Sequence, residues 1–307
     1  MDWTSALAGF ARYQRAAGLS EKTIVNREES LILIARLCGI GPLDVCEEDL
    51  LNMLSRFNPR TGCPLAAGTK QSERSYYQTF FTWMQVKGHR PDNPSAGLPK
   101  IKIPRRKPRP LRIQQVDAML DSGAYKRTRD IITIAALSGL RIGEIVKIRG
   151  EDVDLDGGVL CSLRKGNLAH VIALHPILID LARSYPRTGW WFPSPHRNEQ
   201  FPNGSGHILM KSASARVSKA IRNAGITDRN LTGHSLRHFY ATTLLKQGVN
   251  IRVVQELLGH ASLATTQLYT EVDQDDMRAG VATLPPIAQR RSSARMRTIP
   301  ESDKMVG

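Results

Sequence analysis

The chain has little cysteine and no long apolar run. Only four of its 307 residues are cysteine, none forms a CxxC pair, and no Cys/His group has zinc-finger spacing. The absence of any run of eighteen or more apolar residues argues against a membrane-spanning helix. The first residues, MDWTSALAGFARYQ, lack the basic start and apolar core of a signal peptide. We therefore expect reduced thiols, no metal site, no membrane partner and a cytoplasmic location.

Acidic residues are also scarce relative to basic ones. The chain has 43 lysines and arginines against 28 aspartates and glutamates, a formal charge of +15. Such an excess favours a polyanion as partner, because each neutralised phosphate releases condensed counterions. The alternative is a soluble protein with a solvated basic face. We favour nucleic acid, which would place the protein at the nucleoid.

Residues 1–97 are predicted to form a helical domain. Ser20 can cap a helix that Gly39 ends, and the aromatic residues between 76 and 83 recur at helical spacing, which is typical of a core. Helices are expected at about 3–17, 21–38, 47–57 and 69–88.

A basic, proline-rich linker is predicted at 98–110. It has no acidic residue, and its prolines favour an extended chain. It is either a solvated hinge or a segment that crosses a nucleic-acid backbone. We favour the second, with these DNA-binding candidates: Lys100, Lys102, Arg105, Arg106, Lys107 and Arg109.

Residues 111–285 are predicted to form a larger mixed domain, followed by a weakly patterned tail at 286–307. Strand-like runs VDL, GVLCSL and HVIAL are separated by hairpin-type turns, which predicts a small antiparallel sheet. The expected fold is therefore mainly α with this one small sheet. Helices are expected at 114–121, 127–138, 177–184 and 206–224, and in GHSLRHFYATTLLKQG, NIRVVQELLG and SLATTQLYTEV.

The chain contains the residue types that metal-free cleavage of a DNA strand requires. Two guanidinium groups can hold the phosphate oxygens, a nucleophile must attack phosphorus in line, and a donor must protonate the leaving 5′ oxygen. A phenol, with a pKa near 10, needs nearby cations to act as nucleophile. Each residue alone is weak evidence for DNA cleavage, but their combination, order and spacing support it. The candidate catalytic residues are Arg141, Lys165, His234, Arg237, His260 and Tyr269.

Three boxes resemble those of the tyrosine recombinases, the family of phage integrases and Xer resolvases. They are ALSGLRIGEIVKI, RKGN and LTGHSLRHFYATTLLKQGVNIRVVQELLGHASLATTQLYT, and RSYYQTFFTWMQVKGHRPDNPSAGLPK is similar to the end of the family's core-binding domain. The resemblance implies a helical, SAM-like core-binding domain and a mixed α+β catalytic domain. Arg164-Lys165-Gly166 departs from the more usual Gly-Lys-Gly, and Tyr240 is a weak competitor as nucleophile.

The resemblance also implies a role for each residue. Arg141 and Arg237 would clamp the phosphate, and Lys165 would protonate the 5′ oxygen. His234 would hydrogen-bond the phosphate and assist proton transfer at the tyrosine. His260 would be another donor to the phosphate, and Glu144 would be a supporting residue. Tyr269 would form a 3′-phosphotyrosyl link, which conserves the bond energy, so that neither metal nor ATP is needed.

The partners implied are double-stranded DNA and a homotetramer on paired sites, with a directionality or accessory DNA-bending factor left open. The enzyme could be a phage integrase that acts in viral genome integration or a host resolvase, and the sequence leaves this choice open. Two alternatives remain: strand relaxation like that of a type IB topoisomerase, and a catalytically inactive DNA-binding regulator on the same fold.

Overall fold

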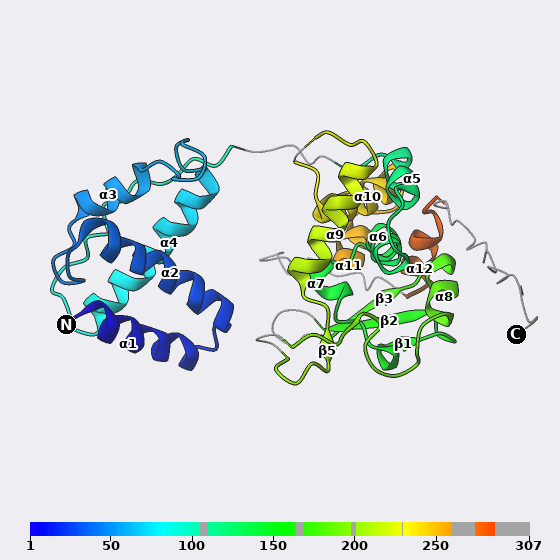
Figure 1. Cartoon of the computed structure of the whole chain (residues 1–307), viewed down its shortest axis with the longest axis horizontal. Coiled ribbons are helices and arrows are strands. Elements are labelled where there is room, and N and C mark those ends of the chain that lie inside the picture. The colour runs from blue at the N-terminus through cyan, green and yellow to red at the C-terminus, as the bar shows by residue number, and fades with distance from the viewer. Residues whose placement is uncertain (105–109, 164–168, 198–200, 229, 260–273, 286–307) are drawn as a thin grey trace, which may run out of the picture. The chain divides into compact units, whose positions relative to one another are not determined.

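The computed structural model describes residues 1–104, 110–163, 169–197, 201–228, 230–259 and 274–285. The chain separates into two compact units, Met1–Lys107 and Pro108–Gly307 (Figure 1). The boundary between them falls inside the segment that the sequence predicts as a linker. Within the ranges just given, no helix combines the length and the apolar character needed to cross a membrane.

The described residues of unit 1, 1–104, form four helices whose ends are set by local chemistry. The Ser20 side chain accepts a hydrogen bond from the Thr23 amide and begins the second helix. Gly39 ends that helix in the left-handed conformation, at φ 69°, which costs glycine little. The four helices are α1 (Trp3–Ala16), α2 (Glu21–Cys38), α3 (Glu47–Ser55) and α4 (Ala67–Val86).

The core of unit 1 is aromatic, as the helical spacing predicts. Phe80 is fully buried and lies in edge contact with Phe10, at 5.3 Å between ring centroids. It also stacks on Trp3 at 5.8 Å. Tyr77, Phe81 and Trp83 are buried in the same cluster, and only Tyr76 of the predicted aromatic set is half-exposed. These rings therefore serve packing and not base stacking.

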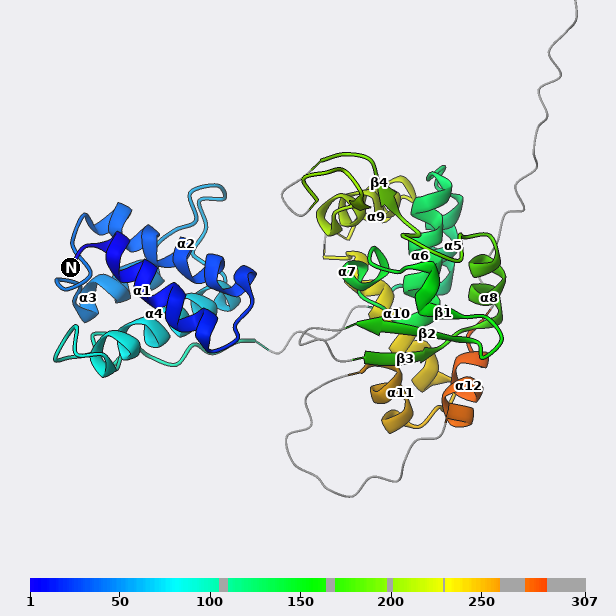
Figure 2. The same ribbon diagram turned by 90° about the horizontal axis from the view of Figure 1, so that it is seen from below.

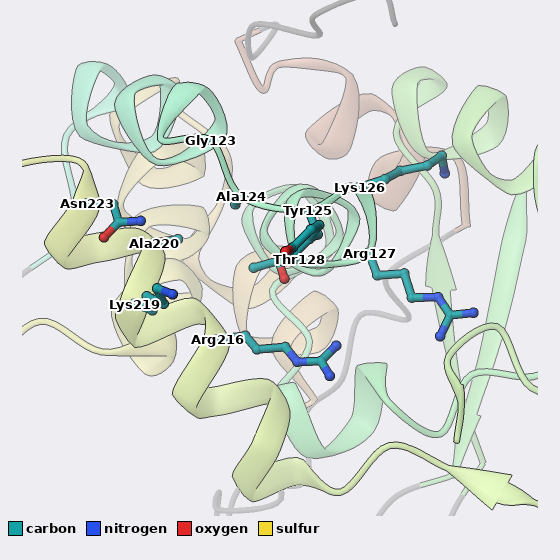
Figure 3. Close-up of a pocket in the computed structure, with 10 residues that line it drawn as sticks. All are labelled: Gly123, Ala124, Tyr125, Lys126, Arg127, Thr128, Arg216, Lys219, Ala220 and Asn223. Carbon is teal, nitrogen blue, oxygen red and sulfur yellow. The ribbon is translucent and has the colours of Figure 1, made fainter. Parts of the chain in front are cut away.

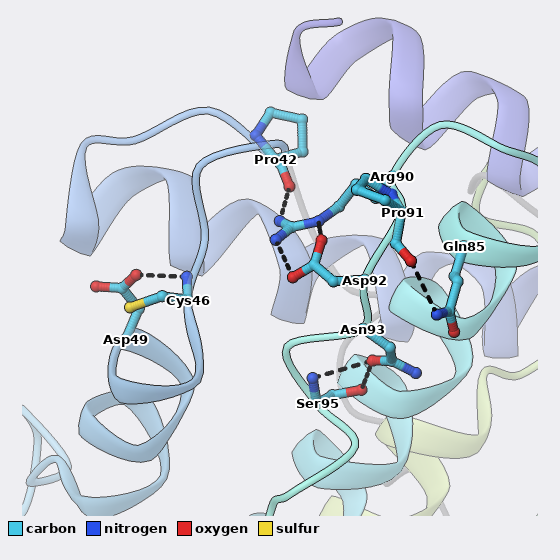
Figure 4. A network of polar contacts seen from close by, with 9 residues as sticks. All are labelled: Pro42, Cys46, Asp49, Gln85, Arg90, Pro91, Asp92, Asn93 and Ser95. Carbon is cyan, nitrogen blue, oxygen red and sulfur yellow. Dashed lines mark hydrogen bonds and ion pairs between the residues drawn. The ribbon is translucent and has the colours of Figure 1, made fainter.

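A buried arginine links two loops of unit 1 by hydrogen bonds (Figure 4). Arg90 is 7% exposed, donates to the carbonyl of Pro42 at 2.9 Å, and pairs with Asp92 at 3.0 Å. Its hydrogen bonds lower the pKa of the Asp92 carboxyl. The arginine thereby ties the α2–α3 connection to the segment that follows α4.

Unit 2 contains most of the helices and both sheets. The helices are α5 (Ile113–Asp121), α6 (Lys126–Ser138), α7 (Ile142–Ile145), the 3₁₀ turn η1 (Gly150–Asp152), α8 (Pro176–Arg183), α9 (Met210–Asn223), α10 (Gly233–Lys246), α11 (Ile251–Leu258) and α12 (Gln274–Ala282). The strands are β1 (Val153–Asp154), β2 (Val159–Leu163), β3 (Ala169–Ala173), β4 (Pro193–Ser194) and β5 (Gly206–His207). This composition confirms the predicted class, mainly α with small antiparallel sheets.

The first sheet has the antiparallel order β1-β2-β3. Val159 pairs with Ala173 at one end of the hairpin, and Leu163 pairs with Ala169 at the other. The second sheet corrects the sequence prediction, which placed a helix over 206–224. Gly206 and His207 instead pair with Ser194 and Pro193, because His207 is buried against aromatic rings there, and the helix begins only at Met210.

Helix α6 is the centre of unit 2, since ten of its thirteen residues are buried. It packs against α10, α9 and α5. Helix α12, which the sequence patterns did not predict, packs beside the edge strand β3 and against α11 (Figure 2). Val281 in α12 and Leu284 just after it are buried in the core of the unit. The predicted helix SLATTQLYTEV lies outside the described residues.

Candidate active site

The turn between α6 and α7 presents the first candidate arginine. Gly139 ends α6 at φ 66°, and a Cβ atom there would lie 2.6 Å from Cδ1 of Tyr240. Only glycine fits this position, because both the conformation and the space exclude a side chain. The chain then turns at once, so that Arg141 becomes the residue that begins α7.

Glu144 holds Arg141 in two ways. One carboxylate oxygen accepts the Arg141 amide at 2.8 Å, and the other accepts its Nη1, also at 2.8 Å. Glu144 is mostly buried at 12% side-chain exposure, whereas Arg141 is 46% exposed. The carboxylate thus fixes both the helix start and the side chain, and it leaves the guanidinium at the surface.

The N-terminus of α10 carries His234 next to α7. The Thr232 side chain caps this helix by accepting from the His234 amide at 3.3 Å. A Cβ atom on Gly233 would lie 2.9 Å from Cγ1 of Ile142, so the first turns of α10 and α7 are in direct contact. The exposed His234 ring meets the His238 ring edge-on, at 4.9 Å between centroids.

Arg237 lies one turn further along α10 and is 4% exposed. Its Nη1 donates to the carbonyl of Gly139 and its Nη2 to the carbonyl of Leu258, both at 2.6 Å. Gly139 lies two residues before Arg141, and Leu258 lies two residues before His260. The buried guanidinium therefore joins three segments that carry candidate residues.

Three predicted site residues, Lys165, His260 and Tyr269, lie outside the described residues. The structure nevertheless fixes the chain on either side of them. Leu163 and Ala169 form the last described pair of the β2–β3 hairpin that contains Lys165. His170 Nε2 is 2.8 Å from the carbonyl of Glu256, which attaches β3 to the last turn of α11.

Of the predicted linker cations, the structure describes only Lys100 and Lys102, and both are exposed. The other four (Arg105, Arg106, Lys107 and Arg109) lie outside the described residues. The structure also shows supporting residues that the sequence did not single out: Gly139, Gly233, His170 and His238. Gly139, Gly233 and His238 stand within the candidate boxes, which is the signal that could have found them, whereas His170 lies outside every box.

The surroundings of the competing tyrosine disfavour it as a nucleophile. Tyr240 is fully buried, and within the described part of the chain its hydroxyl has no hydrogen-bond partner. Burial raises the pKa of this phenol, with a smaller opposing effect from the nearby Arg237 charge. A phenol that is harder to ionise and has no exposed surface is a poor nucleophile.

Comparison with known proteins places this site in a family. The family model described as "Phage integrase family" matches residues 110–276. The chain is 31% identical over 281 residues to tyrosine recombinase XerC of Alcanivorax borkumensis, covering 89% of this chain and 91% of XerC. It is 33% identical over 212 residues to tyrosine recombinase XerD of Yersinia pestis, covering 66% of this chain and 71% of XerD.

Solved structures agree. The integrase of mycobacterium phage Brujita is 32% identical, with 94% of each chain covered and a TM-score of 0.52. A lambda integrase fragment, solved as a dimer bound to a COC′ core site, is 18% identical with a TM-score of 0.67, covering 89% of this chain and 100% of the fragment. At 18% identity, the similarity to lambda integrase is evidence of a shared fold alone. The chain therefore belongs to the phage integrase family of tyrosine recombinases, the enzymes of site-specific DNA recombination.

Proposed function

We propose that this recombinase cuts each DNA strand with Tyr269, using the segments joined by Arg237 to hold the scissile phosphate. The observation that carries the proposal is the pair of 2.6 Å hydrogen bonds from Arg237 to Gly139 and Leu258. They hold together the turn that presents Arg141, the helix that presents His234, and the end of α11 just before His260.

In this proposal Arg141 and Arg237 stabilise charge on the non-bridging phosphate oxygens. Guanidinium groups suit this role because their planar donors match phosphate oxygens. Glu144 would keep Arg141 in position, and His234 and His260 would donate further hydrogen bonds. Donors already fixed before the reaction cost no reorganisation when negative charge develops.

The covalent step exchanges one phosphodiester for another. The Tyr269 oxygen attacks phosphorus while its phenolic proton passes to His234, and the bond to the 5′ oxygen breaks as Lys165 gives that oxygen a proton. A 5′ hydroxyl from a second strand reverses the step and releases the tyrosine. Because bond energy is conserved in the phosphotyrosyl ester, we expect neither ATP nor a metal ion to be required.

The natural substrate would be double-stranded DNA bound by both units. The lambda integrase structures include a dimer on a core site and a tetramer bound to a Holliday junction. We propose a homotetramer on paired sites for this chain too, acting at the nucleoid. The helical unit 1 would bind the core site, and the basic linker, including the exposed Lys100 and Lys102, would follow the DNA backbone. An accessory bending or directionality factor stays a prediction.

A nicked suicide substrate tests the proposal. The nick lets a short 5′ fragment diffuse away after cleavage, which traps the protein on DNA. We expect the intact chain to form a covalent adduct and Tyr269→Phe to form none, with EDTA having no effect. An adduct of normal yield with Tyr269→Phe would refute the nucleophile. Joint molecules from two-site DNA, as opposed to relaxed circles alone, separate recombination from topoisomerase activity.

A further inference from the structure

A second basic site lies on unit 2, in a pocket between the α5–α6 turn and α9 (Figure 3). We call it the α6–α9 pocket. Its volume is about 670 Å³, within the roughly 300–1,000 Å³ typical of ligand sites. It is lined by Gly123, Ala124, Tyr125, Lys126, Arg127, Thr128, Arg216, Lys219, Ala220 and Asn223.

The lining residues include four cations and no carboxylate. The charge of Lys126 is balanced by Asp130, which does not line the pocket and lies 2.8 Å from the Lys126 Nζ. Arg127 donates to the carbonyl of Pro193 at 3.3 Å, a neutral acceptor, and forms no ion pair with a carboxylate of the described residues. Figure 3 shows Arg216 extending from α9 toward the first turn of α6, and Lys219 lies one turn further along α9. The pocket thus concentrates positive charge from two helices.

Both helices carry cations in positions that local electrostatics disfavours by a small amount. The first turn of α6 holds Lys126, Arg127 and Arg129 and no acidic residue, although the positive end of a helix favours acids. Arg216 and Lys219 are like charges three residues apart on one helix, which also repel. Departures from local rules of this kind are expected at functional positions. A bound anion would relieve both repulsions.

We propose that the α6–α9 pocket binds phosphate groups of a nucleotide. Arg216 and Lys219 would hold the phosphate oxygens together with Arg127, beside the amide groups at the start of α6. The Tyr125 ring is 88% exposed at the rim and offers a surface for a base or sugar. The phosphates could come from DNA outside the cleavage point or from a free nucleotide, and the chemistry is the same. The DNA source rests on the proposed function, whereas the anion site does not.

Inorganic pyrophosphate is a direct probe of this site. We expect it to shift the backbone amide resonances of Lys126 to Thr128 in the labelled full-length chain. The double variant Arg216→Gln/Lys219→Gln should weaken its affinity tenfold or more. Both side chains are exposed on α9, and glutamine preserves helix propensity, so equal melting temperatures would show that the fold is intact.

A matched control is Arg183→Gln, which removes an exposed arginine already paired with Asp180 at 2.7 Å. It should leave pyrophosphate binding unchanged. The proposal is overturned if pyrophosphate leaves the Lys126–Thr128 resonances unmoved, or if the double variant binds it as tightly as the parent.

Core-site DNA then identifies the source of the phosphates. The slope of log affinity against log salt gives the number of phosphates that the protein neutralises. The ligand is the DNA backbone if DNA displaces pyrophosphate from the pocket and the double variant neutralises about one to two phosphates fewer than the parent. If DNA and pyrophosphate bind together, the ligand is a free nucleotide. The pyrophosphate titration does not depend on DNA cleavage. Failure of the proposed function would therefore appear separately, as absence of the Tyr269 adduct in the suicide-substrate assay.

Discussion

The guanidinium of Arg237 donates to the carbonyl of Gly139 at 2.6 Å, across 98 residues of sequence. The bond is buried, and it fixes the turn from which Arg141 emerges. The two candidate arginines therefore differ in kind. Arg237 is part of the framework of the site, whereas Arg141 is an exposed group attached to it through Glu144.

Lysine substitutions should separate these roles. Arg237→Lys keeps the charge but cannot reach both carbonyls, and charge-assisted hydrogen bonds contribute about 1.5–3 kcal/mol each, so we expect stability to fall by about 2 kcal/mol or more. Arg141→Lys should cost under about 1 kcal/mol, since its ion pair with Glu144 is exposed on the arginine side. Both should raise the cleavage barrier by about 2–4 kcal/mol. Urea unfolding and single-turnover cleavage measure the two effects, and equal stabilities for the two variants would contradict this division.

Gly139→Ala should destabilise the protein by about 3 kcal/mol. Left-handed backbone costs a non-glycine residue about 1–2 kcal/mol, and the new Cβ would collide with Tyr240 and Leu258. The control is Gly225→Ala, at φ 72° with no atom within 4 Å of the added Cβ, which should cost only about 1 kcal/mol. Urea unfolding compares them. A similar loss for both would mean that Tyr240 and Leu258 move aside.

Tyr240→Phe should form the covalent adduct at the parental level. Its hydroxyl is buried without a partner among the described residues, so removing it should leave stability unchanged or raise it by up to about 1 kcal/mol. The suicide substrate and a thermal melt check both statements. Loss of the adduct together with a parental melting temperature would reopen the choice of nucleophile.

His175 should make the protein less stable as pH falls below about 6.5. Its Nδ1 caps α8 by accepting the Ile177 amide at 3.2 Å, and burial lowers its pKa, partly offset by the Leu284 backbone. The folded chain therefore holds this ring neutral, while below pH 6.5 the unfolded chain binds the proton, and stability is lost by up to about 1.4 kcal/mol per pH unit.

His175→Asn keeps an acceptor at the cap and removes the titration. We expect the variant to lose less stability than the parent between pH 7.5 and 5.5, measured by urea unfolding at both values. Parallel losses in the two proteins would assign the pH dependence to other groups.

Several features of the fold could be predicted because they are local. Ser20 and Gly39 bound α2 through a cap and a left-handed residue, and the aromatic spacing of α4 marks its buried face. The helix predicted over 206–224 was wrong at its start, since Gly206 pairs with a strand twelve residues earlier. Helix α12 was missed because its apolar residues are few, and only contact with β3 and α11 buries them.

The sequence by itself determined the family, the order of the candidate residues and the mainly helical class, because these depend on residue types and short spacings along the chain. Only the tertiary structure decided that Arg237 is a buried tie between Gly139 and Leu258, that Tyr240 is sealed in the core, and that α6 and α9 enclose a basic pocket. Each of these depends on which distant segments pack together. Burial and close approach follow from the sum of many weak contacts across the fold, and no short stretch of sequence records that sum.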